Sequence, residues 1–390
     1  MRVLYISNKP PTPVIDGGTF AMHECLKNFS HISQIDALII ESEKYPYSAN
    51  SQKQVAQHVN HLDTVFIHSK NYLSAFVKSI FSKNSFLMHR FFSKQFAEKL
   101  TNLLKNNYDY IVCDSLFSSA AFALEKVDTS IPLIVRTHNV ESEIWMQRAD
   151  GSKNWVKKVL FKRFAARLKR DEMKIYTQAH AVLTLSDADS TWITNNVSKA
   201  NVIYFPVSVT VSTESETDYS KIGFFHLGSM NWSPNLEAVH YLVNTLWSNN
   251  RLNNLPLKIA GSFSNQIKIN TSSPSFSLVG WVDDATFFMQ NSGTLVTPIF
   301  SGSGIRIKLL EAMALGVPCV TTKLGASGIS ITHSGLLIAE TEDEFVSQLE
   351  KLTLSSELRE QVGKKSKAYI QQFHSEERCI SILNQLFEKA

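Results

Sequence analysis

Arg306, Lys308 and Glu311 follow a glycine- and serine-rich segment within TPIFSGSGIRIKLLEAMALGVPCVTT, residues 297–322. The apolar run before that segment predicts a strand, and the spacing after it predicts a helix from about 305 to 315. A helix N-terminus offers unpaired backbone N–H groups and the positive end of the helix dipole, which together bind anions. Two cations in the first turn oppose that dipole unless an anion is present. The pattern predicts a phosphate site, and the alternative is a solvated helix start with ordinary surface charges.

Three further residues, all in the N-terminal half, are of types that could bind a ligand or take part in catalysis. Gly17 and Gly18 follow the first apolar run, where glycine permits close backbone approach to a phosphate but equally forms a tight turn. His138 ends the apolar run 132–138, so it is either a sugar-contacting group or a core histidine. These alternatives stay open at the level of the residues alone.

Paired carboxylates in the chain do not predict a metal site. Asp283-Asp284 and the pair Asp187 and Asp189 are expected to be turn and helix-start residues. No Asp-x-Asp stands at a strand end within a metal-binding constellation, so no divalent ion is expected to be required. A Gly-x-Ser-x-Gly nucleophile motif is also missing, which disfavours a hydrolase.

The elements that must position these residues alternate along the chain. Strands are predicted at 3–7, 37–40, 64–68, 110–114, 132–138, 181–186 and 201–206 and then at 222–229, 257–262, 276–281, 293–298 and 318–322. Helices are predicted at 19–30, 92–105 and 115–126. Short buried strands alternating with helices imply α/β domains with doubly wound, mostly parallel sheets.

The polar stretch 210–221 lacks apolar periodicity and is the predicted linker. We therefore expect one domain at 1–205 and a second at 206–375. A last helix at about 376–389 is expected to be able to pack back onto the first domain. A chain of 390 residues with 44% hydrophobic and 19% charged residues fits two globular domains.

The cysteines and the N-terminus favour a cytoplasmic protein. The four cysteines are far apart and form no Cys-x-x-Cys pair, which favours reduced thiols over a zinc site or a disulfide framework. The N-terminus lacks the apolar core of a signal peptide, and no apolar run reaches the roughly 20 residues that span a bilayer. Charge is uneven, with 25 Lys and Arg against 18 Asp and Glu in residues 1–205 and an acidic excess beyond. The basic half is expected to face an anionic partner.

The segment 297–322 resembles the C-terminal motif of the retaining glycosyltransferases of family 4, which have the GT-B fold. FFHLGSMNWSPNLEAV (224–239), LKIAGS (257–262) and LVGWVDD (278–284) are similar to segments of that family, in the same order. VRTHNVESEIW (135–145) resembles its N-domain histidine segment, and Gly17-Gly18 its first glycine-rich loop. The resemblance implies two facing doubly wound, Rossmann-like domains with a cleft between them.

The resemblance also implies a role for individual residues. Glu311 matches the second glutamate of the E-x7-E motif, which binds the donor ribose. The first glutamate of that motif is replaced by Ser303, so sugar recognition would rest on Ser303 or on the amides of Gly304 and Ile305. The first C-domain loop, which begins Gly228-Ser229, lacks the cation that the family often has there.

Arg306 and Lys308 are therefore expected to bind the diphosphate, and the Gly280-Trp281-Val282 turn to hold the nucleobase. His138 is expected to bond a sugar hydroxyl and to shape the reacting face. The implied catalytic set is His138, Glu311, Arg306 and Lys308.

The implied function is metal-independent transfer, with retention, of a hexosyl or N-acetylhexosaminyl group from a nucleotide-diphosphate sugar. The acceptor is a glycan, a lipid-linked molecule or an envelope polysaccharide precursor, and no nucleic acid is involved. Two alternatives remain: a non-catalytic nucleotide-sugar-binding protein of the same fold, for which Ser303 would mark the loss of activity, and a nucleotide-sugar epimerase.

The stretch 153–174, KNWVKKVLFKRFAARLKRDEMK, has nine Lys and Arg against two Asp and Glu. Val156, Leu160, Phe164 and Leu168 recur at helical spacing, and a basic amphipathic helix is typical of proteins that bind anionic membrane surfaces. The alternative is an ordinary helix that packs its apolar stripe on the sheet. The first reading predicts a cytoplasmic protein, peripheral at the inner face of the membrane.

Overall fold

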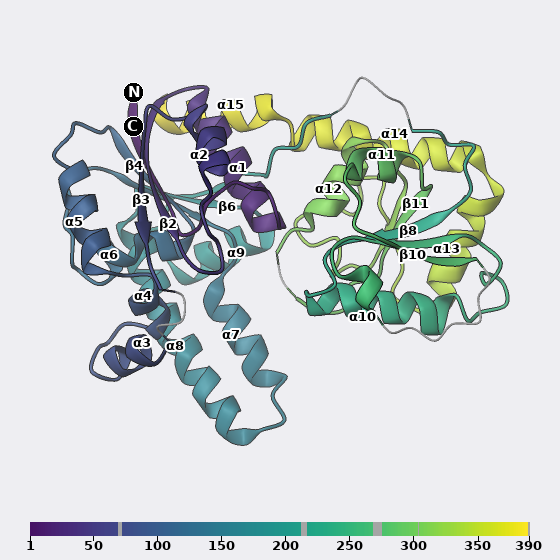
Figure 1. Cartoon of the computed structure of the whole chain (residues 1–390), viewed down its shortest axis with the longest axis horizontal. Coiled ribbons are helices and arrows are strands. Elements are labelled where there is room, and N and C mark those ends of the chain that lie inside the picture. The colour runs from purple at the N-terminus through teal and green to yellow at the C-terminus, as the bar shows by residue number, and fades with distance from the viewer. Residues whose placement is uncertain (69–71, 212–216, 268–274, 303, 389–390) are drawn as a thin grey trace. The chain divides into compact units, whose positions relative to one another are not determined.

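The structure is a computed structural model that describes residues 1–68, 72–211, 217–267, 275–302 and 304–388. The chain divides into two compact units (Figure 1). The first unit is Met1–Val207 with Cys379–Ala390, and the second is Ser208–Arg378. Each unit is described by itself below.

The first unit is built on a parallel sheet of seven strands in the order β3-β2-β1-β4-β5-β6-β7. The strands are β1 (Arg2–Ser7), β2 (Gln34–Glu41), β3 (His61–Phe66), β4 (Tyr110–Asp114), β5 (Leu133–Thr137), β6 (Ala181–Thr184) and β7 (Val202–Tyr204). Because the strand order reverses between β1 and β4, the loops that follow these two strands diverge and leave room for a ligand at that point.

Helices cover both faces of this sheet. They are α1 (Gly17–Ser30), α2 (Ala49–Ala56), α3 (Tyr72–Ile80), α4 (Phe86–Arg90), α5 (Lys94–Leu103), η1 (Leu116–Ser119), α6 (Ala120–Ala123), α7 (Glu141–Asp150), α8 (Trp155–Gln178), α9 (Asp187–Asn196) and α15 (Glu376–Glu388). One core contains apolar residues of α1 and of α15, among them Leu26, Phe29 and Leu383. The other contains residues of α5 and α8, such as Phe96 and Leu168. The last helix of the chain thus completes the first unit.

The second unit has a parallel sheet of six strands in the order β10-β9-β8-β11-β12-β13. The strands are β8 (Phe224–Leu227), β9 (Leu257–Ala260), β10 (Phe276–Gly280), β11 (Thr294–Thr297), β12 (Cys319–Thr321) and β13 (Leu337–Ile338). The helices are α10 (Ser233–Tyr241), η2 (Leu242–Leu246), η3 (Ser264–Gln266), α11 (Ala285–Gln290), α12 (Ile307–Ala314), α13 (Glu342–Leu354) and α14 (Ser356–Phe373). The reversal of strand order lies between β8 and β11, so the second unit is doubly wound as well.

The predicted parallel sheets are confirmed, because each predicted strand overlaps a strand of the structure; of the described strands, only β13 was not predicted. Parallel strands are buried on both faces and are therefore continuous apolar runs, which makes them easy to find. Asp284 caps α11 and Asp187 and Asp189 lie in the first turn of α9, as predicted for helix-start residues. All four cysteines are buried and free of disulfides.

Four local predictions differ from the structure. The predicted helix 115–126 is two short helices, η1 and α6, that end at Ala123. The helix predicted from about 305 begins at Ile307, and the helix predicted from 19 begins at Gly17. Part of the predicted linker 210–221 lies outside the described residues, and the rest packs on the second unit: the Thr217 hydroxyl donates 2.7 Å to the carbonyl of Leu315.

Candidate functional site

The predicted phosphate site lies where the second sheet reverses its strand order. The loop after β8 begins at Gly228, and the loop after β11 leads to α12. The carboxyl ends of these neighbouring strands bring the two loops to one edge of the sheet. Arg306, Lys308 and Glu311 are therefore presented at the position where doubly wound sheets bind ligands.

The start of α12 lacks the usual side-chain cap. Arg306 is its N-cap residue, at φ −92° and ψ 93°, and makes no side-chain hydrogen bond to the first turn. Ser, Thr, Asp and Asn normally fill this position because their oxygens accept from first-turn N–H groups. Gly302 and Gly304 before it have φ of 88° and 83°, which glycine adopts without strain. The loop thus leads into a helix whose first turn has no side-chain cap.

Arg306 is buried, with 4% of its surface exposed, although it carries a charge. Its Nη1 donates 2.6 Å to the carbonyl of Gly304, and its guanidinium carbon lies 5.4 Å from the ring centroid of Trp232. Burial lowers the pKa of Arg306 to about 10. The aromatic face orients the guanidinium, and a cation held in this way has a strong affinity for an anion.

Lys308 is held between two neutral groups. Its ammonium donates 2.6 Å to Oδ1 of Asn235 and lies 3.3 Å from Nε2 of His226. Nδ1 of His226 lies 3.0 Å from the carbonyl of Val296, so Nδ1 carries the proton and Nε2 is the acceptor. Burial, together with Arg306, lowers the pKa of Lys308 to about 7. The Lys308 charge is consequently unbalanced until an anion binds.

Gly228 leaves the space that Asn235 and Lys308 fill. A Cβ atom at this position would lie 2.5 Å from Nδ2 of Asn235 and 3.0 Å from Nζ of Lys308. Asn235 is fixed in turn by its own Nδ2, which donates 2.9 Å to the carbonyl of Ser229. Ser229 keeps its hydroxyl for Oδ1 of Asn231, at 2.7 Å, and for Oγ of Ser262, at 3.2 Å. Gly228 and Ser229 therefore build the lysine site through Asn235.

Glu311 lies one turn beyond Lys308 on α12 and is half-buried. Burial raises the pKa of its carboxyl to about 7, and its side chain has no hydrogen-bond partner among the described residues. A carboxylate in this environment without a hydrogen-bond donor lowers the stability of the fold, and it is available to hydroxyls of a ligand.

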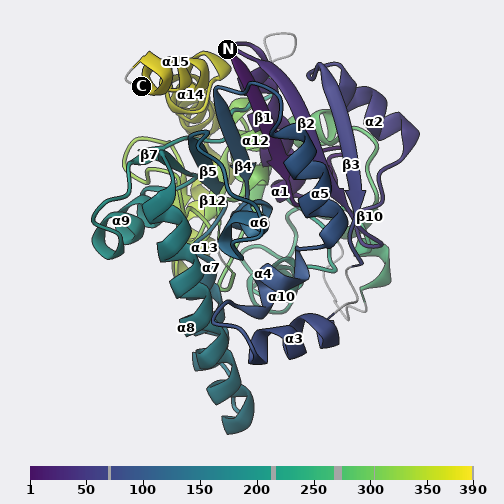
Figure 2. The ribbon, with the colours of Figure 1, turned by 90° about the vertical axis from the view of Figure 1, so that its left-hand side faces the viewer.

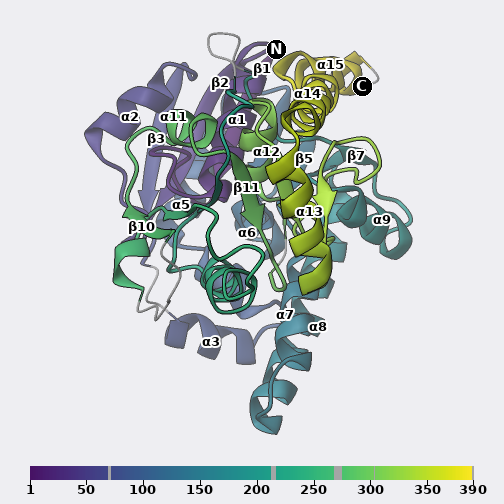
Figure 3. The ribbon, with the colours of Figure 1, turned by 90° about the vertical axis from the view of Figure 1, so that its right-hand side faces the viewer.

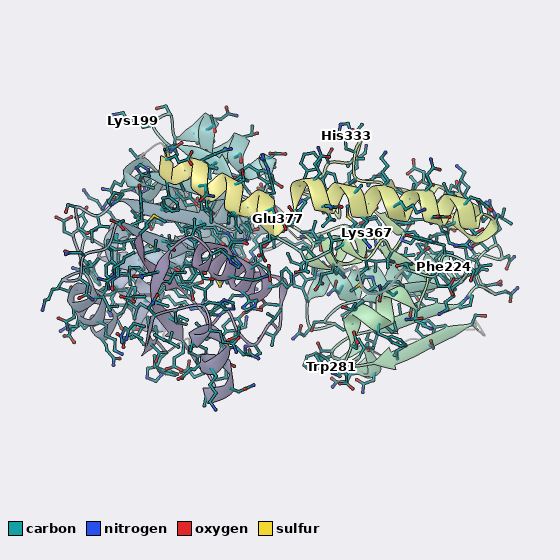
Figure 4. All side chains as sticks on the ribbon, turned by 90° about the horizontal axis from the view of Figure 1, so that it is seen from above. Lys199, Phe224, Trp281, His333, Lys367 and Glu377 are labelled. Atoms are coloured by element: carbon teal, nitrogen blue, oxygen red, sulfur yellow. The ribbon has the colours of Figure 1, made fainter. Side chains whose placement is uncertain are left out.

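The segment predicted to hold the base, Gly280-Trp281-Val282, forms a turn at the end of β10. Gly280 has φ 83°, and its carbonyl accepts a 2.7 Å bond from the amide of Gly261 on the neighbouring strand. Trp281 follows β10 (Figure 4) and is 70% exposed, with its indole Nε1 donating 2.9 Å to Asp283. Val282 lines a cavity of about 300 Å³ with Lys258 and Phe287. Trp281 is therefore accessible, whereas Gly280 is buried.

The residues predicted to contact the sugar are Ser303, Gly304 and Ile305, and the structure describes the last two. Ile305 is half-buried and would be 3.4 Å from a Cβ atom at Gly328, so it packs the loop against that segment. Gly304 offers its carbonyl to Arg306, as described above. Ser303 lies outside the described residues.

His138 belongs to a cluster of charged and polar groups in the first unit, at the carboxyl ends of β4 and β5. Its Nε2 lies 2.7 Å from Oδ1 of Asp114, and Nη1 of Arg136 lies 2.9 Å from the same oxygen. The Tyr5 hydroxyl donates to Oδ2 of Asp114. Because three donors converge on Asp114, its pKa is held well below the usual range despite full burial.

The cluster determines the tautomer of His138. Nε2 donates to Asp114, so in the neutral ring Nδ1 carries the lone pair. Burial lowers the pKa of His138, because the Asp114 charge is already balanced by Arg136. The side chain is 15% exposed. The histidine is thus neither a plain core residue nor a free base, since a buried carboxylate orients it.

Gly17 and Gly18 form the first turn of α1, which begins beside the same strand ends. Asp16 caps the helix by accepting 2.7 Å from the amide of Thr19, and Nζ of Lys9 lies 3.0 Å from Oδ1 of Asp16. A Cβ atom at Gly18 would lie 2.7 Å from Nζ of Lys9. Gly18 therefore admits a cation to the start of α1, a contact that the sequence did not reveal.

The sequence analysis missed His226, Asn235, Asp114 and Lys9. His226 and Asn235 lie in the segment 224–239, whose family likeness was noted without assigning them a role. Asp114 ends a predicted strand beside His138, and that shared edge was the available signal. Among the described residues, no group of three or more His, Cys, Asp and Glu has the arrangement of a metal site.

Residues 221–354 match the model of a family described as "Glycosyl transferases group 1". No curated protein matches the chain. Sucrose-phosphate synthase from Thermosynechococcus elongatus is similar in structure, with TM-score 0.69, 12% identity and coverage of 100% of this chain and 98% of that one. HepE from Anabaena in complex with UDP has TM-score 0.65 and 13% identity, with 100% of both chains covered. A point mutant of TarM from S. aureus, in complex with UDP among other ligands, has TM-score 0.64 and 12% identity, with 99% of this chain and 100% of that one covered.

Proposed function

Residues 221–354 match the glycosyl transferases of group 1 and the chain has the GT-B fold of two Rossmann-like domains, and on this premise we propose its reaction. The protein moves a sugar, a hexosyl or N-acetylhexosaminyl group, from a nucleoside diphosphate sugar to an acceptor, with retention at the anomeric carbon. The observation that carries the proposal is the start of α12, where the Arg306 cation is buried and the Lys308 ammonium is bonded to the neutral Asn235 and His226.

The diphosphate of the donor binds to Arg306, Lys308 and the first amides of α12. When the sugar leaves its donor, negative charge develops on the departing diphosphate, and preorganised cations and a helix dipole stabilise that charge. This assignment explains why the fold keeps a lysine between Asn235 and His226 despite the cost of burying it.

The nucleoside is held on both sides of this site. Glu311 accepts hydrogen bonds from the ribose hydroxyls, and the Gly280–Val282 turn contacts the base. Sugar recognition falls to Ser303 and to the amides of Gly304 and Ile305, in place of a first glutamate.

His138 donates no proton to the leaving group in this proposal. Its Nδ1 accepts a hydrogen bond from a hydroxyl of the transferred sugar, since Nε2 is engaged by Asp114. The acceptor hydroxyl attacks from the side of the leaving diphosphate, so no protein nucleophile and no divalent ion take part. Gly17 and Gly18 permit close approach of the backbone to a phosphate.

Uridine diphosphate sugars are the first donors to test, because the HepE and TarM structures were obtained with UDP. The acceptor is a glycan or a lipid-linked precursor of an envelope polysaccharide. We place the reaction in the cytoplasm, in keeping with four free cysteines.

The proposal is tested by incubating the protein with UDP-glucose and UDP-N-acetylglucosamine and measuring UDP release with and without candidate glycan acceptors. Without acceptor, we expect slow hydrolysis of the donor. With acceptor, we expect faster transfer with retention, which NMR would detect as an α-linked product. Lys308→Ala should abolish UDP release, whereas Lys323→Ala, an exposed lysine of the same unit, should not.

The competing functions give other outcomes. Tight UDP binding without any turnover would identify a non-catalytic binder, and interconversion of the sugars without UDP consumption would identify an epimerase. A thermal-shift screen over nucleoside diphosphates would find the base, since a ligand at about 100 times its dissociation constant adds roughly 2.7 kcal/mol.

A further inference from the structure

The helix pair α7–α8 extends beyond the rest of the first unit, with the N-terminal end of α8 at its tip (Figures 1, 2 and 3). The apolar stripe of α8 is buried along one half of the helix and exposed along the other. Leu168 is buried, and Phe164 packs on Phe86 and Trp145 at ring distances of 4.7 and 5.5 Å. Val156 and Leu160, two turns earlier, are 54% and 37% exposed. The predicted packing helix and the predicted membrane helix are thus different halves of α8.

The exposed apolar residues form one face of the tip. Trp155 and Val159 are 76% and 52% exposed, and with Val156 and Leu160 they recur at i, i+1, i+4 and i+5. That spacing places all four on one side of a helix. We call this set, Trp155, Val156, Val159 and Leu160, the tip face.

The packing face of α8 points the other way. Phe161 and Phe164 both contact Trp145 of α7, each at a ring distance of 5.5 Å, and Ala165 is buried. At about 100° per residue, Phe161 and Ala165 lie roughly on the opposite side of α8 from the centre of the tip face, and Phe164 lies at the border between the two sides. Since α7 covers that opposite side, it does not cover the tip face.

Cations surround the tip face, and Asp150 is the acid that pairs with one of them. From Gly151 to Arg170 the sequence has no Asp or Glu, and α8 has no acidic residue in its first turn. Lys153, Lys157 and Arg163 are exposed, whereas Lys162 lies 3.8 Å from Asp150. Lysines at a helix N-terminus oppose the helix dipole, so this end of α8 is destabilised until an anionic surface lies against it.

A second exposed apolar group lies at the same end of the unit. Val77 of α3 is 45% exposed and Phe81, just after α3, is 87% exposed. α3 packs against α8 through Phe76 and Phe164, whose rings are 6.2 Å apart, and through Arg167, which donates to the carbonyl of Ser79. α3 thus packs on α8 next to the tip face, and Val77 and Phe81 add exposed apolar area to the same unit.

We propose that the tip face and its cations dock on the surface of an anionic lipid bilayer. Aliphatic and aromatic side chains beside lysines suit a headgroup region, where apolar groups enter and ammonium groups meet lipid phosphates. A nucleic acid would leave Val156, Val159 and Leu160 in water, and a purely apolar partner would leave the cations unpaired. Among the described residues, no helix is long and apolar enough to cross a membrane.

This inference goes beyond the donor chemistry, because it concerns the surface at which the protein encounters its acceptor. It can fail while the transferase proposal stands, since vesicle binding and UDP release are measured separately. The test uses the full chain with sedimenting vesicles of phosphatidylcholine alone or with phosphatidylglycerol. Expected is binding to the anionic vesicles at low salt, loss of binding when salt exceeds about 0.5 M, and none to phosphatidylcholine alone.

Matched variants separate the tip from overall charge. The triple variant Lys153→Glu, Lys157→Glu and Arg163→Glu should weaken vesicle binding on the order of a hundred-fold or more. The control triple Lys53→Glu, Lys105→Glu and Lys199→Glu makes the same change in net charge on exposed lysines elsewhere in the first unit, of which Lys199 is labelled in Figure 4. This control should keep most of the binding.

The apolar part is tested by Trp155→Ser with Val159→Ser, which should reduce binding at every salt concentration. Equal loss in both triple variants would overturn the proposal in favour of unspecific charge attraction. Failure of the wild-type protein to sediment at low salt would overturn it as well. So would self-association by light scattering that the Trp155→Ser, Val159→Ser variant removes, because the tip face would then bind a second copy.

Discussion

Nε2 of His226 lies 3.3 Å from Nζ of Lys308, and the opposite ring nitrogen bonds the carbonyl of Val296. The buried imidazole is neutral, since burial and Lys308 hold the pKa of His226 well below its usual value. Lys308 therefore has acceptors for its hydrogens but no negative charge beside it among the described residues. A diphosphate supplies that charge, so ligand binding should also bring a proton to Lys308.

Nucleoside diphosphate affinity should consequently fall as pH rises above 7. The pKa of Lys308 is about 7 in the free protein, and a bound diphosphate raises it. Between these two pKa values the complex binds more protons than the free protein, so affinity drops with pH, by about five-fold between pH 7 and 8. Calorimetry in buffers of different ionisation enthalpy measures both the affinity and the proton uptake.

Lys308→Arg is the control for this titration, because an arginine stays charged over the whole range. Its affinity should be nearly constant between pH 7 and 9. A wild-type affinity that does not change over this range would show that Lys308 is already charged or does not meet the diphosphate.

Gly228→Ala should weaken UDP binding without unfolding the second unit. The new Cβ atom would lie 2.5 Å from Nδ2 of Asn235, so Asn235 and then Lys308 must move. Loss of one charge-assisted contact corresponds to about 1.5–3 kcal/mol, or roughly ten-fold to a hundred-fold in affinity. Isothermal titration with UDP measures the effect. Gly151→Ala, where the nearest atom would be at 3.5 Å, should leave affinity unchanged.

The sequence predicts the strands and the cationic helix start because both are local. A buried parallel strand is a continuous apolar run, and Arg306, Lys308 and Glu311 stand within six positions of one another. The supporting groups are not local. Asn235 and His226 reach Lys308 from 73 and 82 positions away, so only the register of β8 beside β11 brings them together.

The basic helix illustrates a different limit of sequence analysis. Val156, Leu160, Phe164 and Leu168 share one periodicity, and nothing in that pattern distinguishes covered from exposed turns. The covering side chains, including Trp145, come from other elements of the first unit. Periodicity therefore predicts an apolar stripe, and tertiary packing alone decides how far along the helix it is buried.

Glu311→Gln should weaken the binding of uridine, UDP and UDP-sugars by similar factors, since the proposed partner is the ribose. It should also stabilise the free protein at pH 8. Burial raises the pKa of Glu311 to about 7, so the folded chain binds more protons than the unfolded one and loses stability as pH rises toward 7. Titrations and urea unfolding measure these opposite effects. Lost affinity for UDP-sugars alone would instead make Glu311 a sugar contact.

His138→Ala should lower the turnover of sugar transfer, because it removes a contact to the sugar worth about 0.5–1.5 kcal/mol. UDP affinity should stay within about two-fold, because UDP lacks that sugar. Its tautomer gives an independent readout. Long-range ¹⁵N NMR should find the proton of the neutral ring on Nε2, directed at Asp114. A ring protonated on Nδ1 would remove the acceptor that the proposal assigns to the sugar hydroxyl.

Asp114→Asn should destabilise the first unit by about 3–5 kcal/mol, because Arg136 would be left as a buried charge without its carboxylate. The low pKa of Asp114 means that this stability is fully present above pH 4 and is lost as pH falls below that value. Urea unfolding at pH 7 and pH 3 should therefore show a wild-type loss that the variant lacks. The double variant Asp114→Asn with Arg136→Met should recover part of the stability at pH 7, because no unpaired charge remains. If the single variant were as stable as wild type, Arg136 would have another counter-charge, and the orientation of His138 would need a different cause.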